Sequence, residues 1–190
     1  MKIVLIDNYD SFTWNLFHLI KSVCTDEDTV DVLFNDRIDL DTARVYDRIV
    51  ISPGAGTPSE TGLVRYIIRE LAAEKPILGI CLGHQAIAEV FGAGLYNIDH
   101  PVHGVKSRIK IVDKSGLFAG LDDYVYAGRY HSWMVSADNF PEELKIMAVD
   151  SHGNIMALSH CIYKVYGIQF HPESIMTECG RKIMDHFING

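Results

Sequence analysis

Apolar and polar residues follow two different periods along the first half of the chain. Four short and nearly continuous apolar runs are typical of strands buried on both faces of a sheet: residues 2–6, 30–34, 48–52 and 77–80. Apolar residues recur at helical spacing in the segments that follow these runs, most weakly in the second: residues 11–23, 39–46, 60–74 and 84–91. This alternation predicts βαβ units that build a parallel sheet.

The second half of the chain shows a different pattern, because strands follow one another there without helices between them. The predicted strands are residues 107–112, 124–127, 144–150, 154–160 and 163–170. Short turns such as Ser151-His152-Gly153 indicate antiparallel hairpins. A helix over residues 177–188 closes the pattern. We therefore predict a three-layer α/β fold in which a parallel core continues into an antiparallel extension.

Length and composition narrow the class of protein. The 190 residues are 48% hydrophobic, which suits one domain over residues 1–190 with a sizeable core. The net charge of −8 and the lack of a basic run argue against nucleic acid as a partner. No apolar run reaches the roughly 18 residues of a membrane span, and the N-terminus does not resemble a signal peptide. We expect a cytoplasmic protein without a membrane partner.

The four cysteines do not follow the spacing of a disulfide framework. Cys24, Cys81, Cys161 and Cys179 are widely separated, and a cytoplasmic compartment keeps thiols reduced. Neither Cys81 with His84 nor the His160-Cys161 pair has a second pair at zinc-finger spacing. We therefore expect no disulfide, no metal and no other cofactor.

Cys81 occupies the sharpest change of pattern in the chain. A short apolar strand ends at this residue, and a helical pattern begins directly after Gly83. Such a turn projects a nucleophile at the carboxyl end of a sheet, and glycines at positions 79 and 83 leave room for it. The free N–H of Leu82 and the positive helix end would favour an oxyanion and a thiolate. The alternative is a cysteine that is buried for packing alone.

A second segment, GIQFHPE at residues 167–173, offers the groups that a cysteine nucleophile needs. It is again a short strand that ends in polar residues. His171 and Glu173 lie two residues apart and share one side of an extended chain, so the first can act as the base and the second can orient it. Pro172 between them favours the extended conformation at His171.

The motifs GICLGHQ (79–85) and QFHPES (169–174) resemble those of the class I glutamine amidotransferases. In that family a Cys-His-Glu triad hydrolyses the side-chain amide of glutamine, which implies catalytic roles for Cys81, His171 and Glu173. The segments VLIDNYDSFTWNL, ISPGAGTPSETG and RYHSW are similar to the glutaminase subunits of anthranilate synthase and aminodeoxychorismate synthase. The resemblance implies a flavodoxin-like fold, no cofactor, and a partner that is a chorismate-binding synthase subunit.

The resemblance also assigns residues around the PGAG turn. By itself this turn lacks the lysine of a phosphate-binding loop and the pattern of a dinucleotide fingerprint. By resemblance, Gly54 and Leu82 donate the two oxyanion N–H groups, and Gly54, Ala55 and Gly56 line the glutamine site. Ala55 stands where the family more often has proline, so we expect a less rigid loop.

Three further residues are assigned to glutamine by the same resemblance. Gln85 lies one helical turn after Cys81 and can reach the same pocket. The backbone of Ser132 and Trp133, in a polar cluster predicted to lie between strands, meets the α-amino and α-carboxylate groups. Trp133 replaces the leucine that is more common in the family.

Several functional alternatives remain open at this point. The product of the partner can be anthranilate, aminodeoxychorismate or both. Amidotransferases that feed carbamoyl phosphate, GMP or CTP synthesis share the triad, but they usually include further sequence not found in these 190 residues. A cysteine hydrolase that acts alone would need no partner. The non-enzymatic alternative is a flavodoxin-like binding module with an incidental cysteine.

The partner is expected to dock on residues 8–14. The loop after the first strand lies on the same carboxyl edge of the sheet as the turn at Cys81. Tyr9, Phe12 and Trp14 place aromatic side chains there, and aromatic residues are common anchors of interfaces. The helical spacing of Phe12 also fits a core position.

Overall fold

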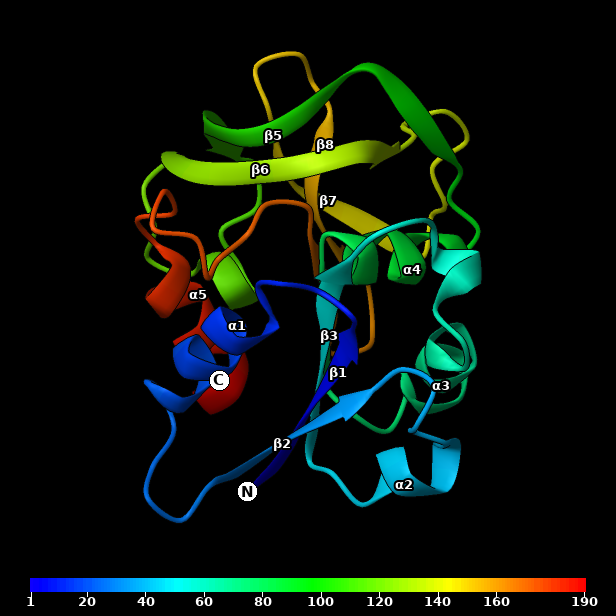
Figure 1. Ribbon diagram of the computed structural model, residues 1–190. Helices are drawn as coiled ribbons and strands as arrows, with labels where there is room; N and C mark the ends of the chain where they lie inside the picture. The colour runs from blue at the N-terminus through cyan, green and yellow to red at the C-terminus, as the bar shows by residue number, and fades with distance from the viewer.

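A nine-stranded sheet runs through the whole protein in the computed structural model, which describes residues 1–190 (Figure 1). The strands are β1 (Lys2–Asn8), β2 (Thr29–Phe34), β3 (Arg48–Gly54), β4 (Ile77–Ile80), β5 (Leu95–Ile111), β6 (Tyr124–Val135), β7 (Leu144–Val149), β8 (Ile155–His160) and β9 (Val165–Ile168). The helices are α1 (Thr13–Lys21), α2 (Leu40–Arg44), α3 (Val64–Leu71), α4 (Leu82–Val90) and α5 (Gly180–Asn189), with short 3₁₀ turns η1 (Pro58–Glu60) and η2 (Gly116–Phe118).

The strand order β2-β1-β3-β4-β9-β8-β7-β5-β6 confirms the predicted mixed sheet. Neighbours from β2 to β9 pair in parallel, and neighbours from β9 to β6 pair antiparallel. The last strand, β9, therefore belongs to both parts, whereas the sequence had placed it wholly in the antiparallel part. Because β4 and β9 run in the same direction, their carboxyl ends meet at one edge.

Helices cover both faces of the parallel core, as a three-layer fold requires. Alternate residues of β1 point to opposite faces: Ile3 and Leu5 pack with α1 and α5, while Val4 and Ile6 pack with α2 and α3. Figure 1 shows α1 and α5 on one side of the strands and α2, α3 and α4 on the other. Two apolar cores result, one on each face of the sheet.

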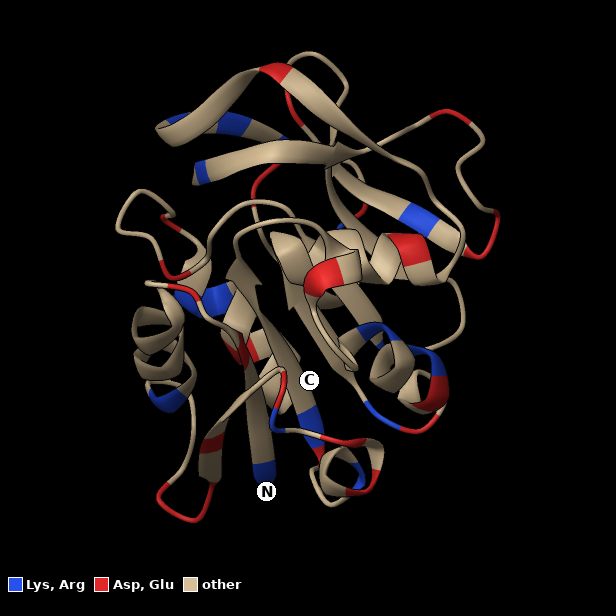
Figure 2. Cartoon of the chain, turned by 45° about the vertical axis from the view of Figure 1, so that its right-hand side comes forward, with Lys and Arg blue, Asp and Glu red and all other residues tan.

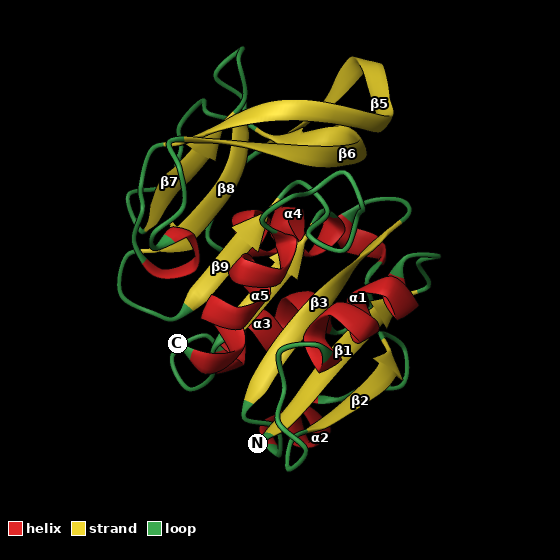
Figure 3. Cartoon of the chain, turned by 90° about the vertical axis from the view of Figure 1, so that its left-hand side faces the viewer, coloured by secondary structure: helices red, strands yellow, loops and turns green.

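The main error of the sequence prediction concerns β5 and β6. Both strands are longer than predicted, and residues 129–133, predicted to lie between strands, are part of β6. For most of its length β5 pairs only with β6, and the two form a ribbon above α4 (Figure 3). Most of β5 is exposed or half-buried, so its sequence lacks the apolar pattern of a buried strand, whereas β6 is largely buried.

The predicted helix ends also need correction. Helix α3 begins at Val64 instead of residue 60, because Gly62 has a φ of 58° and breaks the helical path. Helix α5 begins at Gly180 instead of residue 177. Helix α1 begins at Thr13 instead of residue 11, and just before it Asp10 accepts a hydrogen bond of 2.7 Å from the Phe12 N–H.

Two features of the surface bear on function. None of the helices has the length and apolar character needed to span a membrane. Acidic residues are spread over loops and helices in both parts of the molecule, in line with the net charge of −8 (Figure 2).

Candidate active site

The carboxyl ends of β4 and β9 bring Cys81 and His171 to the same edge of the sheet. Ile80 and Ile168 are in register, and the Cys81 N–H donates to the Ile168 carbonyl at 2.8 Å. Beyond β9 the chain turns toward β6, where the His171 N–H donates to the carbonyl of Gly128 at 3.0 Å. The candidate nucleophile and base thus come from adjacent parallel strands.

Cys81 has the strained backbone of a nucleophile at a tight turn. Its φ of 51° and ψ of −99° lie outside the usual regions for a residue with a side chain, and such strain costs about 1–3 kcal/mol. A Cβ on Gly79 would collide with the Gly83 carbonyl, and one on Gly83 would collide with Ile51. Helix α4 starts at Leu82, two residues before the prediction, and the Leu82 N–H donates to no protein acceptor.

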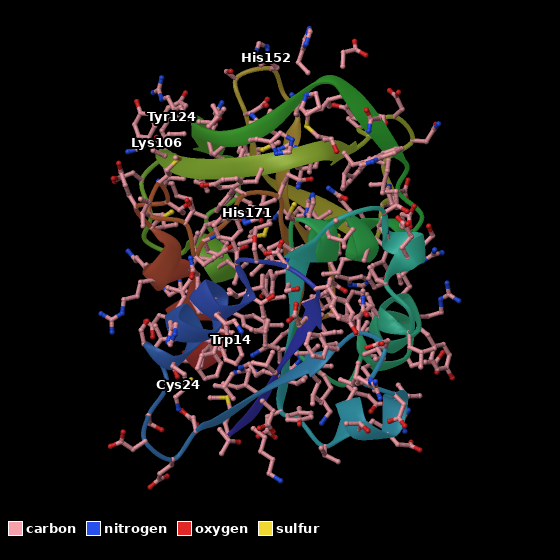
Figure 4. All side chains as sticks on the ribbon, viewed as in Figure 1. Trp14, Cys24, Lys106, Tyr124, His152 and His171 are labelled. Carbon is pink, nitrogen blue, oxygen red and sulfur yellow. The ribbon has the colours of Figure 1, made fainter.

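His171 and Glu173 form a buried pair beside Cys81. The Nδ1–H of His171 donates to Glu173 Oε1 at 2.6 Å, and the two side chains are 3% and 0% exposed. Nε2 of His171 has no hydrogen-bond partner and remains available. Burial lowers the pKa of His171, but interactions with Cys81 and Glu173 outweigh it and raise the pKa to about 10. The imidazolium form is therefore favoured next to the sulfur. Figure 4 shows His171 near the centre of the molecule, below the β5–β6 ribbon.

A cavity of about 310 Å³ opens onto Cys81. All of the residues predicted to bind glutamine line it: Gly54, Ala55, Gly56, Gln85, Ser132 and Trp133. Gly54 ends β3 and packs closely against Asn8, with which a Cβ at position 54 would collide. Ala55 and Gly56, which follow Gly54, are exposed. The cavity therefore brings together three chain segments around the sulfur.

Gln85 is buried, and its amide has a fixed place in the wall of this cavity. Nε2 donates to the carbonyl of Trp133 at 3.0 Å and to Oε1 of Gln169 at 3.1 Å. Oε1 of Gln85 has no protein donor. This arrangement leaves an acceptor oxygen available to a bound molecule.

Sequence reasoning missed several residues at this site. The cavity wall also includes Asp10, His103, Tyr130 and His131. Burial raises the pKa of Asp10. The only signal in the sequence was that some of them lie close to predicted site residues. Asp10 lies in the loop after β1, Tyr130 and His131 precede Ser132 in β6, and His103 lies opposite Tyr130 in β5.

His131 is held as a neutral ring with a defined tautomer. Nε–H of Arg129 donates to His131 Nε2 at 3.1 Å, so Nδ1 carries the hydrogen and donates to the Trp133 carbonyl at 3.1 Å. Burial and the charge of Arg129 lower the pKa of His131 to about 3. The Trp133 carbonyl is therefore fixed by two donors, one from His131 and one from Gln85.

The structure contains no group of three His, Cys, Asp or Glu side chains that could hold a metal ion. All four cysteines are free thiols.

Comparisons with known proteins give a consistent result. The family model described as glutamine amidotransferase class I matches residues 4–189. The chain is 41% identical over 98% of its length to aminodeoxychorismate synthase component 2 of Klebsiella aerogenes, of which it covers 99%. It is 42% identical over 98% of its length to anthranilate synthase component 2 of Methanothermobacter marburgensis, of which it covers 97%.

Two further relatives differ in length or name. The bifunctional protein TrpGD of Thermotoga maritima is 39% identical over 99% of the chain, which spans only 32% of that protein. A crystal structure from Thermoplasma acidophilum, described as part of a putative GMP synthase, superposes with a TM-score of 0.88 at 29% identity. This superposition covers 100% of the present chain and 92% of the Thermoplasma protein.

His84, in α4 beside the site, predicts a pH-dependent stability. Its side chain is fully buried, neither ring nitrogen has a partner, and burial lowers its pKa from 6.5 to about 4. Below about pH 6.5 the unfolded chain therefore binds a proton at His84 that the folded protein does not bind. The free energy of unfolding consequently decreases as the pH is lowered from about 6.5 to about 4. Each pH unit in this range costs up to about 1.4 kcal/mol.

We expect the variant His84→Leu to lose less stability than the wild type between about pH 7 and pH 5. Urea unfolding at several pH values measures this difference. His152→Gln, which alters an exposed histidine at the far end of the molecule, is the control (Figure 4). An unchanged pH dependence in His84→Leu would show that His84 is not the source of the effect.

Proposed function

Because the chain belongs to the class I glutamine amidotransferase family, we propose that it hydrolyses glutamine and delivers the ammonia to a chorismate-aminating synthase subunit. The observation that best supports this proposal is that Cys81 lines the cavity and has the buried His171–Glu173 pair beside it. We assign the function to one domain over residues 1–190 in the cytoplasm, where the four free thiols would stay reduced.

The proposed reaction proceeds in two halves. The Cys81 thiolate attacks the side-chain amide carbon of glutamine, and the oxyanion that forms accepts hydrogen bonds from the N–H groups of Gly54 and Leu82. His171 then protonates the amide nitrogen, the C–N bond breaks, and ammonia leaves behind a glutamyl thioester. Each oxyanion donor contributes on the order of 3 kcal/mol.

In the second half, water attacks the thioester. His171 accepts a proton from the water, the new C–O bond forms, and the C–S bond breaks to release glutamate and restore the Cys81 thiolate. Glu173 keeps the imidazole in place through the hydrogen bond to Nδ1. The second proton of the water leaves the new γ-carboxyl group for solvent or for the released ammonia, so the products are glutamate and ammonium.

The polar ends of glutamine find partners on the opposite wall. Oε1 of Gln85 would accept from the α-amino group, and the backbone of Ser132 and Trp133 would meet the α-amino and α-carboxylate end. Ala55 and Gly56 would line the side-chain path to Cys81. The cavity volume of about 310 Å³ suits a single amino acid.

The partner is proposed to make anthranilate. Similarity to anthranilate synthase component 2 and to aminodeoxychorismate synthase component 2 is nearly equal, at 42% and 41% identity. We therefore keep the second product, or service to both synthases, as the alternative candidate function.

The partner would dock at the end of α1 nearest the cavity. Tyr9 and Trp14 are 62% and 59% exposed, while the Phe12 ring lies 5.7 Å from the ring of His171. Two aromatic anchors thus flank a residue that touches the catalytic base. Docking could shift the Gly54–Gly56 loop into its active position, a coupling of about 1–3 kcal/mol.

The variant Cys81→Ser tests the proposed activity in the complex with the synthase subunit. We expect glutamine-dependent amination to fall on the order of a thousandfold or more, because a serine hydroxyl is a far weaker nucleophile than a thiolate. Amination with added ammonium salts should remain at the wild-type rate, since the partner is intact. Equal loss of both rates would contradict the assigned role.

The double variant Tyr9→Ala, Trp14→Ala tests the docking surface. We expect the isolated wild-type chain to be a poor glutaminase and the partner with chorismate to activate it. The double variant should require on the order of tenfold more partner for the same activation, the size of a lost interface anchor. Tyr66→Ala, an exposed tyrosine of α3 on the opposite face, is the control. Full activity of the isolated chain, or unaltered activation of the double variant, would exclude this surface.

A further inference from the structure

Gln169 makes a contact with Cys81 that the reaction described above does not use. It directly follows β9, its side chain is 0% exposed, and its Nε2 lies 3.5 Å from Cys81 Sγ. Its backbone N–H donates to the carbonyl of Met156 at 2.9 Å, which holds the residue against β8. Oε1 accepts from Gln85 Nε2 at 3.1 Å. Gln169 thus bridges the nucleophile and a wall of the substrate cavity.

The direction of these hydrogen bonds is set by groups outside the cavity. Arg129 can only donate, and its NH1 is paired with Asp150 at 3.0 Å. Its Nε–H makes His131 Nε2 an acceptor, so the Nδ1–H of His131 points to the Trp133 carbonyl.

The same logic continues to the sulfur. The Trp133 carbonyl can only accept, so Gln85 must present its nitrogen there. That nitrogen also faces Gln169, which must then present Oε1 to it. The remaining end of the Gln169 amide is its NH₂ group, and it faces Cys81 Sγ. The sulfur therefore accepts from Gln169, and as a thiol it also donates to the Tyr130 carbonyl at 3.8 Å. When the thiol ionises, the bond to Tyr130 is lost and the bond from Gln169 becomes charge-assisted.

We propose that Gln169 is a positioning residue that holds the Cys81 sulfur as a hydrogen-bond acceptor and links it to Gln85. This proposal rests on the proposed function. The bond stabilises the thiolate and fixes the sulfur on the cavity side of the strained turn. Through Gln85, the same amide connects the sulfur to the residue that faces the substrate α-amino group.

Two variants separate this role from simple core packing. Gln169→Met has a similar volume but removes the donor to sulfur and the acceptor for Gln85. Gln169→Glu keeps the shape and an oxygen for Gln85 Nε2, but it places an oxygen instead of an N–H group near the sulfur. Met156→Leu changes a fully buried neighbour and leaves every side-chain hydrogen bond of the site in place, so it is the matched control.

The experiment reads three quantities in the complex with the synthase subunit. They are kcat and KM for glutamine, the pH midpoint of Cys81 alkylation by iodoacetamide, and the thermal unfolding temperature. We expect both Gln169 variants to lower kcat about tenfold to a hundredfold, the range of a lost charge-assisted hydrogen bond, with KM changed less. The alkylation midpoint should move to higher pH in both, and Met156→Leu should show neither effect.

An unchanged alkylation midpoint and a kcat within about twofold of wild type in a folded Gln169→Glu variant would overturn the proposal. The two proposals fail in different ways. If wild-type Cys81 hydrolyses no glutamine, the proposed function is wrong, while the alkylation midpoint still reports the contact between Gln169 and the sulfur. If the wild type is active and the midpoint does not move, only the role of Gln169 is wrong.

Discussion

Cys81 is held at a φ of 51° because the backbone around it is packed too closely to relax. Gly79 and Gly83 have no space for a Cβ, and β4 is buried between β3 and β9. The sheet and α4 together maintain a conformation that an isolated turn would avoid. In this conformation the sulfur faces the cavity, and the Leu82 N–H has no protein acceptor. Each feature of the site is arranged relative to this residue.

Electrostatics then makes the packed turn reactive. A fully buried carboxylate such as Glu173 is costly unless a charged or hydrogen-bonded partner compensates it. His171 provides that compensation, and the raised pKa of His171 favours the imidazolium form beside Cys81. The same edge of the sheet receives Gln85, Gln169 and the fixed carbonyl of Trp133. Substrate binding and nucleophile activation therefore share one buried network of hydrogen bonds.

Much of this arrangement could be predicted from the sequence, because strands buried on both faces leave apolar runs and because Cys81 and His171 each end such a run. The β5–β6 ribbon could not, since most of β5 has a strand on one side only and shows no buried pattern. Gln169 was visible only as part of a motif. Its contact with Cys81 depends on the pairing of β4 with β9, which brings residues far apart in the chain together.

The most direct test of this account is labelling of the protein with a chloroketone analogue of glutamine, followed by mass-spectrometric mapping. We predict that Cys81 reacts first among the four thiols and that glutamine protects it. Burial raises the pKa of Cys24, and raises that of Cys179 to about 11, so both should react slowly. Cys161 is exposed but lies outside the cavity and should show no protection by glutamine. Labelling of Cys161 at the rate of Cys81, or no protection of Cys81, would contradict the account.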